Sequence, residues 1–214
     1  NNPMSTGGHS ASVEAEDLAA LIRQQQLAPA HVVGVSYGAY TALLLAHRHP
    51  DLVRSLVLVE PPLIGWLADL PGGPALHDEF VDGTWRPTRR AFERGDTTEA
   101  LRVTLDFFMG EGAAQTLPPE VGSALLDNIR EWQALTMSED PFPRISRSDV
   151  GNIDKPALML SGGRSYPMLR LIDDELERQL KRGQRVVIAD GSHDVCTEQW
   201  ERCLAYIRTF LASQ

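Results

Sequence analysis

The sequence predicts an α/β protein with a mostly parallel sheet and a helical insertion. Apolar runs rich in β-branched residues alternate with segments of helical periodicity, which is the order expected of a parallel sheet. A long central stretch, residues 63–150, instead carries helical patterns punctuated by tryptophan, glycine and proline. With 214 residues, of which 43% are hydrophobic, the chain is large enough for one sizeable core and an inserted segment.

Before the insertion, the pattern indicates a helix, a strand, a second helix and a second strand. The first helix is expected at 12–25, where acidic residues near its start suit the helix dipole. A β-branched strand follows at 31–35, and the next helix begins after Ser36 and ends where Pro50 stops it. The run 56–59 is apolar throughout, which is typical of a buried parallel strand.

The insertion separates these elements from a second set of strands and helices. Within it, helical segments are expected at 87–94, 97–109 and 118–137. After it, strands are expected at 157–160 and 185–188, and helices at 167–181 and 196–212. The predicted organisation is therefore a core in two parts, 1–62 and 151–214, with a helical cap inserted at 63–150.

The stretch around Ser36 has the pattern of a nucleophile elbow. Gly34, Ser36 and Gly38 form Gly-x-Ser-x-Gly between an apolar strand and a helix, the context in which a serine is presented on a sharp turn. Because the two glycines lack a Cβ, we expect them to let the strand and the helix approach closely. The helix directs its N-terminal N–H groups to the same place, where an anion would be stabilised. Ser36 is therefore the candidate nucleophile.

A serine nucleophile needs a base, and the base needs a carboxylate that orients it. His193 is the candidate base, because it lies in a loop just after the last apolar strand, at the ligand-facing edge of a parallel sheet. Glu60 is the candidate acid, since it ends the strand after the elbow and is followed by two prolines. Asp190 and Asp194 flank His193 and compete for this role, although residues so close in sequence reach the imidazole Nδ1 poorly.

Taken together, these motifs resemble the α/β-hydrolase superfamily over nearly the whole chain. The resemblance is carried by Gly34–Gly38, Leu56–Pro62, Lys155–Gly162 and Gly191–His193, and the order nucleophile, acid, histidine is also that of the superfamily. It implies an α/β-hydrolase sheet with an inserted helical cap.

The position of the acid departs from the commonest arrangement in that superfamily. Most members carry an aspartate a few residues past the strand that here ends at Leu160, where this chain has Gly162-Gly163-Arg164-Ser165. Some members place the acid at the end of the strand after the elbow, which is the position of Glu60. Dehalogenase and epoxide hydrolase chemistry is not expected, because those relatives use aspartate where this chain has Ser36.

The resemblance also implies strands that this sequence lacks. Superfamily members have several strands and a His-Gly loop before the elbow helix, whereas here a helix at 12–25 is nearly the first element. The Tyr37 backbone N–H is expected to supply one oxyanion donor, and the second has no visible source in the sequence. The sheet is expected to have an unpaired edge, so either a homo-oligomer or a complementing N-terminal segment is the expected partner.

The function implied is that of a serine hydrolase that cleaves a carboxylic ester or lactone through Ser36, His193 and Glu60, without a metal or cofactor. An alternative is a ligand-binding or interaction module of the same fold without turnover, and a third is haloperoxidase-like or lyase chemistry on the same triad. Five aromatic residues are expected either to line an apolar acyl pocket or to pack as ordinary core: Trp66, Trp85, Phe107, Phe108 and Trp132.

Composition limits the partners and the compartment. A net charge of −9 argues against a nucleic-acid or anionic-membrane surface, and no apolar run is long enough to span a bilayer. Cys196 and Cys203 fall in one predicted helix, at a spacing that keeps their Cα atoms too far apart for a disulfide between them. Unpaired thiols and the lack of a signal-peptide pattern favour a cytoplasmic protein that acts on a small molecule.

Overall fold

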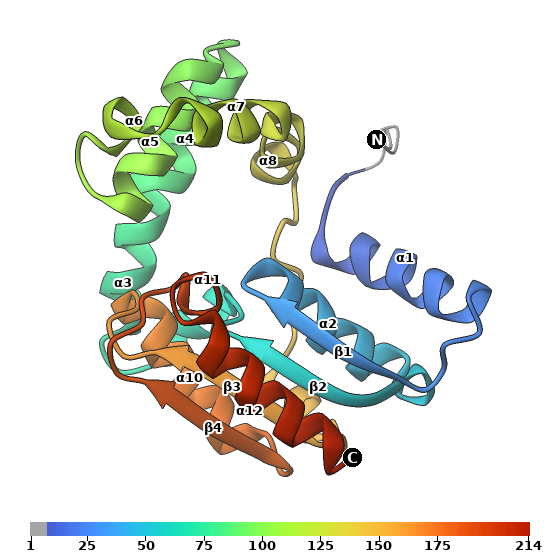
Figure 1. Cartoon of the computed structure of the whole chain (residues 1–214). Coiled ribbons are helices and arrows are strands. Elements are labelled where there is room, and N and C mark those ends of the chain that lie inside the picture. The colour runs from blue at the N-terminus through green and yellow to red at the C-terminus, as the bar shows by residue number, and fades with distance from the viewer. Residues whose placement is uncertain (1–7) are drawn as a thin grey trace. The chain divides into compact units, whose positions relative to one another are not determined.

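The computed structural model describes residues 8–214, which form two compact units (Figure 1). The strand-bearing unit comprises Ala11–Gly73 and Phe142–Gln214, and the helical unit comprises Pro74–Pro141 together with residues 8–10. The helical unit is shorter at both ends than the predicted cap of 63–150. The first seven residues of the predicted core segment 1–62 lie outside the described residues. The assignment of residues 63–150 as a cap stays a prediction.

The strand-bearing unit is built on a four-stranded sheet in which all neighbouring strands are parallel, which confirms the predicted fold class. The strand order is β1 (Ala30–Val35), β2 (Val53–Val59), β3 (Ala157–Gly162) and β4 (Gly183–Ile188). All six residues of β3 and all but one of the seven in β2 are buried, as expected for central parallel strands rich in Val and Leu. Because the strands are parallel, their carboxyl ends meet at one edge of the sheet.

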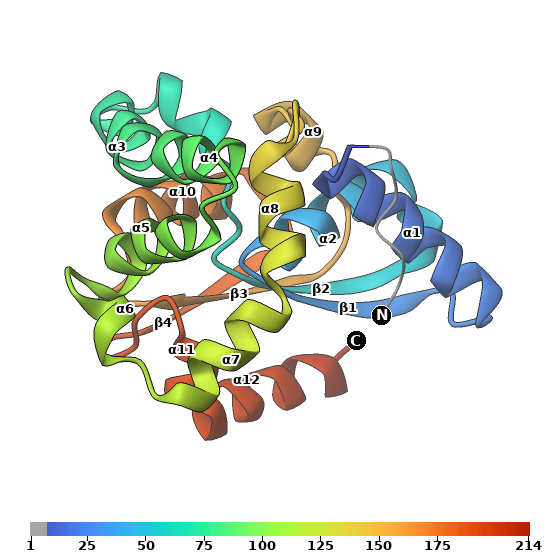
Figure 2. The ribbon, with the colours of Figure 1, turned by 90° about the horizontal axis from the view of Figure 1, so that it is seen from above.

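Helices cover both faces of the sheet (Figure 2). On one face lies α12 (Trp200–Ala212), and on the other lie α2 (Tyr37–Arg48) and α10 (Pro167–Gln179). Three further helices belong to this unit: α1 (Ala11–Gln24), α9 (Arg147–Gly151) and α11 (Val195–Glu198). Of these, α1 packs against α2. A short 3-10 helix, η1 (Pro50–Leu52), leads into β2, and a longer one, η2 (Ile64–Asp69), follows it.

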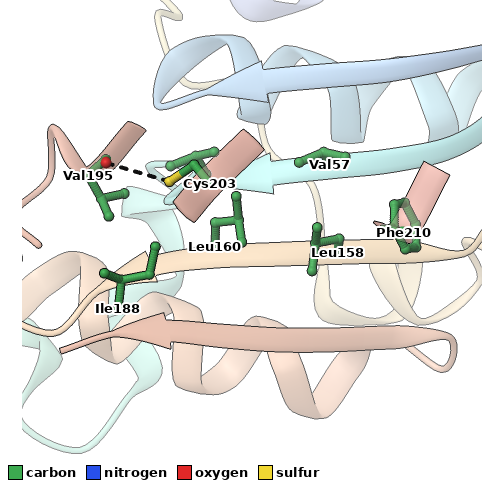
Figure 3. Packing of buried hydrophobic residues seen from close by; sticks show 8 residues of the cluster. Val57, Leu158, Leu160, Ile188, Val195, Cys203 and Phe210 are labelled. Atoms are coloured by element: carbon green, nitrogen blue, oxygen red, sulfur yellow. Dashed lines mark hydrogen bonds between the residues drawn. The ribbon is translucent and has the colours of Figure 1, made fainter. Parts of the chain in front are cut away.

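The core beneath α12 joins the sheet to the C-terminal helices (Figure 3). Its buried members come from β2, β3, β4, α11 and α12: Val57, Val59, Leu158, Leu160, Ile188, Val195, Cys203 and Phe210. Burying each Val, Leu, Ile or Phe side chain contributes about 1.5–3 kcal/mol, so this cluster fixes the position of the loop between β4 and α11. That loop carries His193.

The predicted C-terminal helix is in fact two helices. The chain leaves helical geometry at Gln199, where φ is −122° and ψ is 39°, and this separates α11 from α12. Cys196 and Cys203 therefore lie on different helices, and both are free thiols. The single helix from which their separation was predicted is therefore wrong, and the two thiols interact, since a hydrogen bond with Cys203 is among the causes that raise the pKa of Cys196. No helix within residues 8–214 has the length and apolarity needed to cross a membrane.

The helical unit contains seven segments connected by short turns. They are α3 (Gly73–Phe80, whose first residue belongs to the other unit), a π-helical turn (Val81–Trp85), α4 (Arg86–Glu93), α5 (Thr97–Met109), α6 (Ala113–Thr116), α7 (Pro119–Asp127) and α8 (Ile129–Met137). Asp96 caps α5, accepting a hydrogen bond from the Glu99 backbone N–H at 3.0 Å. The single helix predicted at 118–137 is interrupted at Asn128.

Strand β1, which leads into the elbow, is the outermost strand on its side. No strand among residues 8–214 pairs with its outer edge. Its Val33 and Val35 side chains are 51% and 48% exposed, although valine is a residue that usually lies inside. This is the unpaired edge that the sequence predicted.

Candidate active site

Ser36 stands at a strained turn between β1 and α2. Its φ of 50° and ψ of −119° place a non-glycine residue in a rarely populated backbone region. The turn is fixed by the Ser36 N–H, which donates to the Val59 carbonyl at 2.7 Å, and by Gly34. A Cβ on Gly34 would lie 2.4 Å from the Gly38 carbonyl oxygen and 2.6 Å from the Ala39 Cα, so only glycine fits there.

The second glycine of the motif, Gly38, is not required by close packing. A Cβ on Gly38 would meet no heavy atom within 4 Å, and the residue is exposed. The expectation that both glycines permit close approach of strand and helix is therefore correct for Gly34 and wrong for Gly38. The reason is geometric: Gly34 faces the first turn of the helix, whereas Gly38 belongs to that turn.

Glu60 follows β2 directly and is buried, with its side chain 0% exposed. Its backbone has a φ of 47°, in the left-handed region, so the chain turns sharply as it leaves the strand. In the sheet register Val35 lies opposite Val59, so Ser36 and Glu60 each follow one member of that pair. The two side chains therefore emerge from adjacent strands at the same sheet edge.

His193 lies between Ser36 and Glu60 and contacts both. Its Nδ1 is 2.6 Å from Glu60 Oε2, and its Nε2 is 3.1 Å from Ser36 Oγ. A buried carboxylate at Nδ1 accepts a hydrogen bond from the Nδ1–H group and so keeps the proton on that nitrogen, which leaves Nε2 as the acceptor that faces the serine hydroxyl. The structure thus brings together three residues that are 24 to 157 positions apart in sequence.

The competing carboxylates lie elsewhere. Asp190 pairs with Arg202 on α12 at 2.7 Å, and the hydrogen bond from that guanidinium lowers the pKa of the Asp190 carboxyl. Asp194 precedes α11, and its backbone N–H donates to Ser192 Oγ at 3.1 Å. The carboxylate within hydrogen-bonding distance of the His193 ring is that of Glu60.

Two donors to Glu60 were missed by sequence analysis. The Gly162 N–H donates to Glu60 Oε1 at 2.7 Å, and the Ser165 hydroxyl donates to Oε2 at 2.6 Å. Both belong to the turn after β3, which the sequence showed only as a stretch without a carboxylate. The signal available was the Gly-Gly pair at a strand end, which marks close backbone approach.

That close approach joins the turn after β3 to the loop that carries His193. A Cβ on Gly162 would lie 2.1 Å from the Ser192 carbonyl oxygen, and one on Gly163 would lie 2.5 Å from the Ala189 carbonyl oxygen. The Gly163 N–H also donates to the Ile188 carbonyl at 2.8 Å. The turn after β3 therefore contacts both the acid and the loop of the base.

The comparison with known proteins agrees with this architecture. A family model described as the alpha/beta hydrolase family matches residues 5–206. The chain belongs to the α/β-hydrolase family.

Named relatives of this α/β hydrolase include an esterase. The chain is 29% identical over 194 residues to a pimeloyl-[acyl-carrier protein] methyl ester esterase of Neisseria meningitidis, covering 86% of this chain and 69% of the relative. Among solved structures, carboxylesterase CesB (YbfK) from Bacillus subtilis matches with a TM-score of 0.68 at 16% identity, covering 100% of this chain and 71% of that one. MGS-M2, an alpha/beta hydrolase enzyme from a Medee basin deep-sea metagenome library, matches with a TM-score of 0.70 at 19% identity, covering 97% and 74%.

Two tyrosines lie next to residues of the site in this α/β hydrolase, Tyr37 in sequence and Tyr166 in space. The Tyr37 ring, on the residue after Ser36, packs edge-on against Phe142 with centroids 5.8 Å apart. The centroid of the Tyr166 ring lies 5.7 Å from that of the His193 ring, and burial raises the pKa of Tyr166 to about 12. The Tyr166 ring therefore packs against the imidazole as a neutral phenol.

A cavity of about 430 Å³ lies beside the elbow, within the strand-bearing unit. The residues that line it include the aromatic Tyr40, Trp66 and Phe142 and the basic Arg144 and Arg147. Trp66 donates its indole N–H to the Ile145 carbonyl at 2.8 Å, so this predicted aromatic is part of a packed wall. Ser36, Glu60 and His193 are not among the lining residues.

A second buried carboxylate, Asp173 of α10, lies behind β3 and is 1% exposed. Ser161 donates its hydroxyl to Asp173 Oδ2 at 2.5 Å, and the Arg185 guanidinium is 3.9 Å away. Burial raises the pKa of Asp173 to about 7, against the favourable effects of Ser161 and Arg185. Its other oxygen, Oδ1, has no hydrogen-bond partner among the described residues.

Proposed function

We propose that this α/β hydrolase is a serine hydrolase that cleaves a carboxylic ester or lactone through an acyl-enzyme. The observation that carries the proposal is the position of His193, whose two ring nitrogens contact Ser36 Oγ and Glu60 Oε2. This is the arrangement that a hydroxyl nucleophile requires, because serine attacks a carbonyl only when a base removes its proton.

In the proposed reaction, Ser36 Oγ attacks the ester carbonyl carbon while His193 Nε2 takes the hydroxyl proton. The carbon–oxygen bond to the alcohol then breaks, and His193 returns the proton to the departing alkoxide. Water attacks the acyl-enzyme with His193 again as the base, which releases the carboxylic acid and restores Ser36. For a lactone, the alcohol and the acid remain in one molecule.

Glu60 and the start of α2 stabilise the charges that develop. Glu60 fixes the imidazole tautomer and stabilises the imidazolium, since its carboxylate is buried and lies 2.6 Å from Nδ1. The Tyr37 N–H, at the first position of α2, is the proposed oxyanion donor, and the positive end of the twelve-residue helix adds to it.

The comparisons support the ester as the substrate class. The relative with 29% identity is named for the hydrolysis of a methyl ester, and one structural neighbour is named a carboxylesterase.

A fluorophosphonate probe tests the proposal, because it phosphonylates only an activated serine. We expect labelling of the purified protein that is lost in Ser36→Ala and retained in Ser55→Ala. Ser55 is a matched control, since it is a fully buried serine at the opposite end of β2. A folded protein that the probe does not label would instead support the ligand-binding alternative.

A further inference from the structure

The turn after β3, residues 162–165, holds the carboxylate that the base depends on. We infer that Ser165 is a positioning residue, which orients Glu60 toward His193 and tunes the charge that the imidazole experiences. The inference rests on the proposed function for its kinetic consequences, because it assigns a role within the same site.

The hydrogen bonds of Glu60 show how the orientation is fixed. Oε1 accepts from the Gly162 N–H at 2.7 Å, and Oε2 accepts from both the Ser165 hydroxyl and His193 Nδ1, each at 2.6 Å. The terminal torsion of a glutamate side chain is broad, so rotation of the carboxylate is restrained only by what binds its oxygens. With a donor on each oxygen, Oε2 stays directed at the imidazole.

Of the three donors to Glu60, only Ser165 can be removed by a substitution that leaves the backbone and the base in place. Gly162 donates through its backbone, and His193 is the base itself. Ser165 is 5% exposed, and its hydroxyl carries a single hydrogen, which the contact with Glu60 uses. The hydroxyl thus stabilises a buried carboxylate, because an anion without hydrogen-bond donors in the protein interior raises the free energy of the folded state.

Sharing Oε2 also affects the base electronically. The Ser165 hydrogen bond withdraws charge from the same oxygen that interacts with the imidazolium. When that bond is removed, the carboxylate attracts the imidazolium more strongly and holds it in the protonated form to higher pH. The acidic limb of the kcat/KM profile should therefore move to higher pH, while the catalytic rate falls because the carboxylate is less well oriented.

The experiment compares Ser165→Ala, Ser165→Thr and Ser55→Ala for ester hydrolysis across pH. Since a hydrogen bond to a charged group corresponds to a factor of about 10 to 100, we expect Ser165→Ala to lower kcat at least about 10-fold. KM should change little, and the acidic limb should shift to higher pH. Ser165→Thr retains the hydroxyl and should recover most of kcat. Ser55→Ala removes a buried hydroxyl 2.7 Å from His31 Nδ1 and should leave the acidic limb in place.

Proton NMR of the His193 Nδ1–H provides a measurement that does not depend on turnover. Its low-field resonance should move in Ser165→Ala and stay in place in Ser55→Ala, whether or not the protein hydrolyses an ester. If the wild-type protein fails to react with the fluorophosphonate but the resonance moves, the proposed function fails and the positioning role stands. An unchanged resonance together with an unchanged pH profile would overturn the role of Ser165. So would a loss of kcat that Ser165→Thr does not restore and that leaves the acidic limb unmoved.

Discussion

Replacing Glu60 by glutamine tests the acid most directly, because the two side chains have the same shape. Three donors converge on the carboxylate, from Gly162, Ser165 and His193. An amide offers one acceptor oxygen and one NH2 group. If the amide oxygen faces Gly162, the NH2 group donates a hydrogen bond to His193 Nδ1, so the imidazole must carry its proton on Nε2. In that tautomer the imidazole cannot take the proton of Ser36.

The opposite orientation of the amide is also unfavourable. The NH2 group would then lie about where Oε1 lies, 2.7 Å from the Gly162 nitrogen, so that two donors face each other in a buried site. Leaving them unsatisfied costs about 1–3 kcal/mol, so the glutamine adopts the orientation with the wrong tautomer. We expect kcat to fall about 10³–10⁴-fold, equivalent to about 4–5.5 kcal/mol in the activation barrier.

The assay is steady-state hydrolysis of a chromogenic ester, with urea unfolding of each variant to show that all are folded. Asp190→Asn and Asp194→Asn are the matched controls, since each removes one carboxylate charge next to the same loop, and each should change kcat less than about 3-fold. The assignment of Glu60 is refuted if Glu60→Gln keeps more than a tenth of the wild-type kcat. It is equally refuted if Asp190→Asn loses as much.

Two further predictions concern stability. The pKa of Asp173 is raised from 3.8 to about 7 by burial, so the native state holds this proton more tightly than the unfolded chain, and stability is lost as pH rises from about 4 through 7. Asp173→Asn removes that dependence. The unfolding free energy of the variant minus that of the wild type, measured in urea, should therefore rise by up to about 3 kcal/mol between pH 5 and pH 8. A difference that stays constant with pH would contradict the assigned cause. Gly34→Ala places a Cβ 2.4 Å from a carbonyl oxygen. It should lower the free energy of unfolding by about 1–3 kcal/mol or more and abolish labelling by the fluorophosphonate probe. Gly38→Ala, where the space is open, should cost much less in the same unfolding measurement.

The sheet and the three clustered residues were predictable because each has a local signal. The strands are continuous apolar runs, and Ser36 lies in a five-residue motif between a strand and a helix. Glu60 and His193 both follow apolar strands, and the carboxyl ends of parallel strands share one edge. The pattern of each segment alone therefore placed all three side chains at that edge.

The support around those residues was not predictable, because it arises from contacts between distant segments. Ser165 and Glu60 are 105 positions apart, and a serine two residues after a glycine pair looks like any turn. The break at Gln199 is equally hidden, since the sequence around it keeps helical spacing while the backbone departs from it. Local patterns fix where elements lie, and the tertiary hydrogen bonds decide how their ends are used.

Each of the four strands contributes a residue to the site at its carboxyl end or in the segment that follows it. Ser36 follows β1, Glu60 follows β2, Gly162 and Ser165 belong to the end of β3 and its turn, and His193 lies in the loop after β4. The outermost of the four described strands thus carry Ser36 and His193, the two partners that exchange a proton in the proposed reaction. The distance between them depends on the register of all three strand pairs, so a shift in any one pair would change the geometry of the proposed proton transfer.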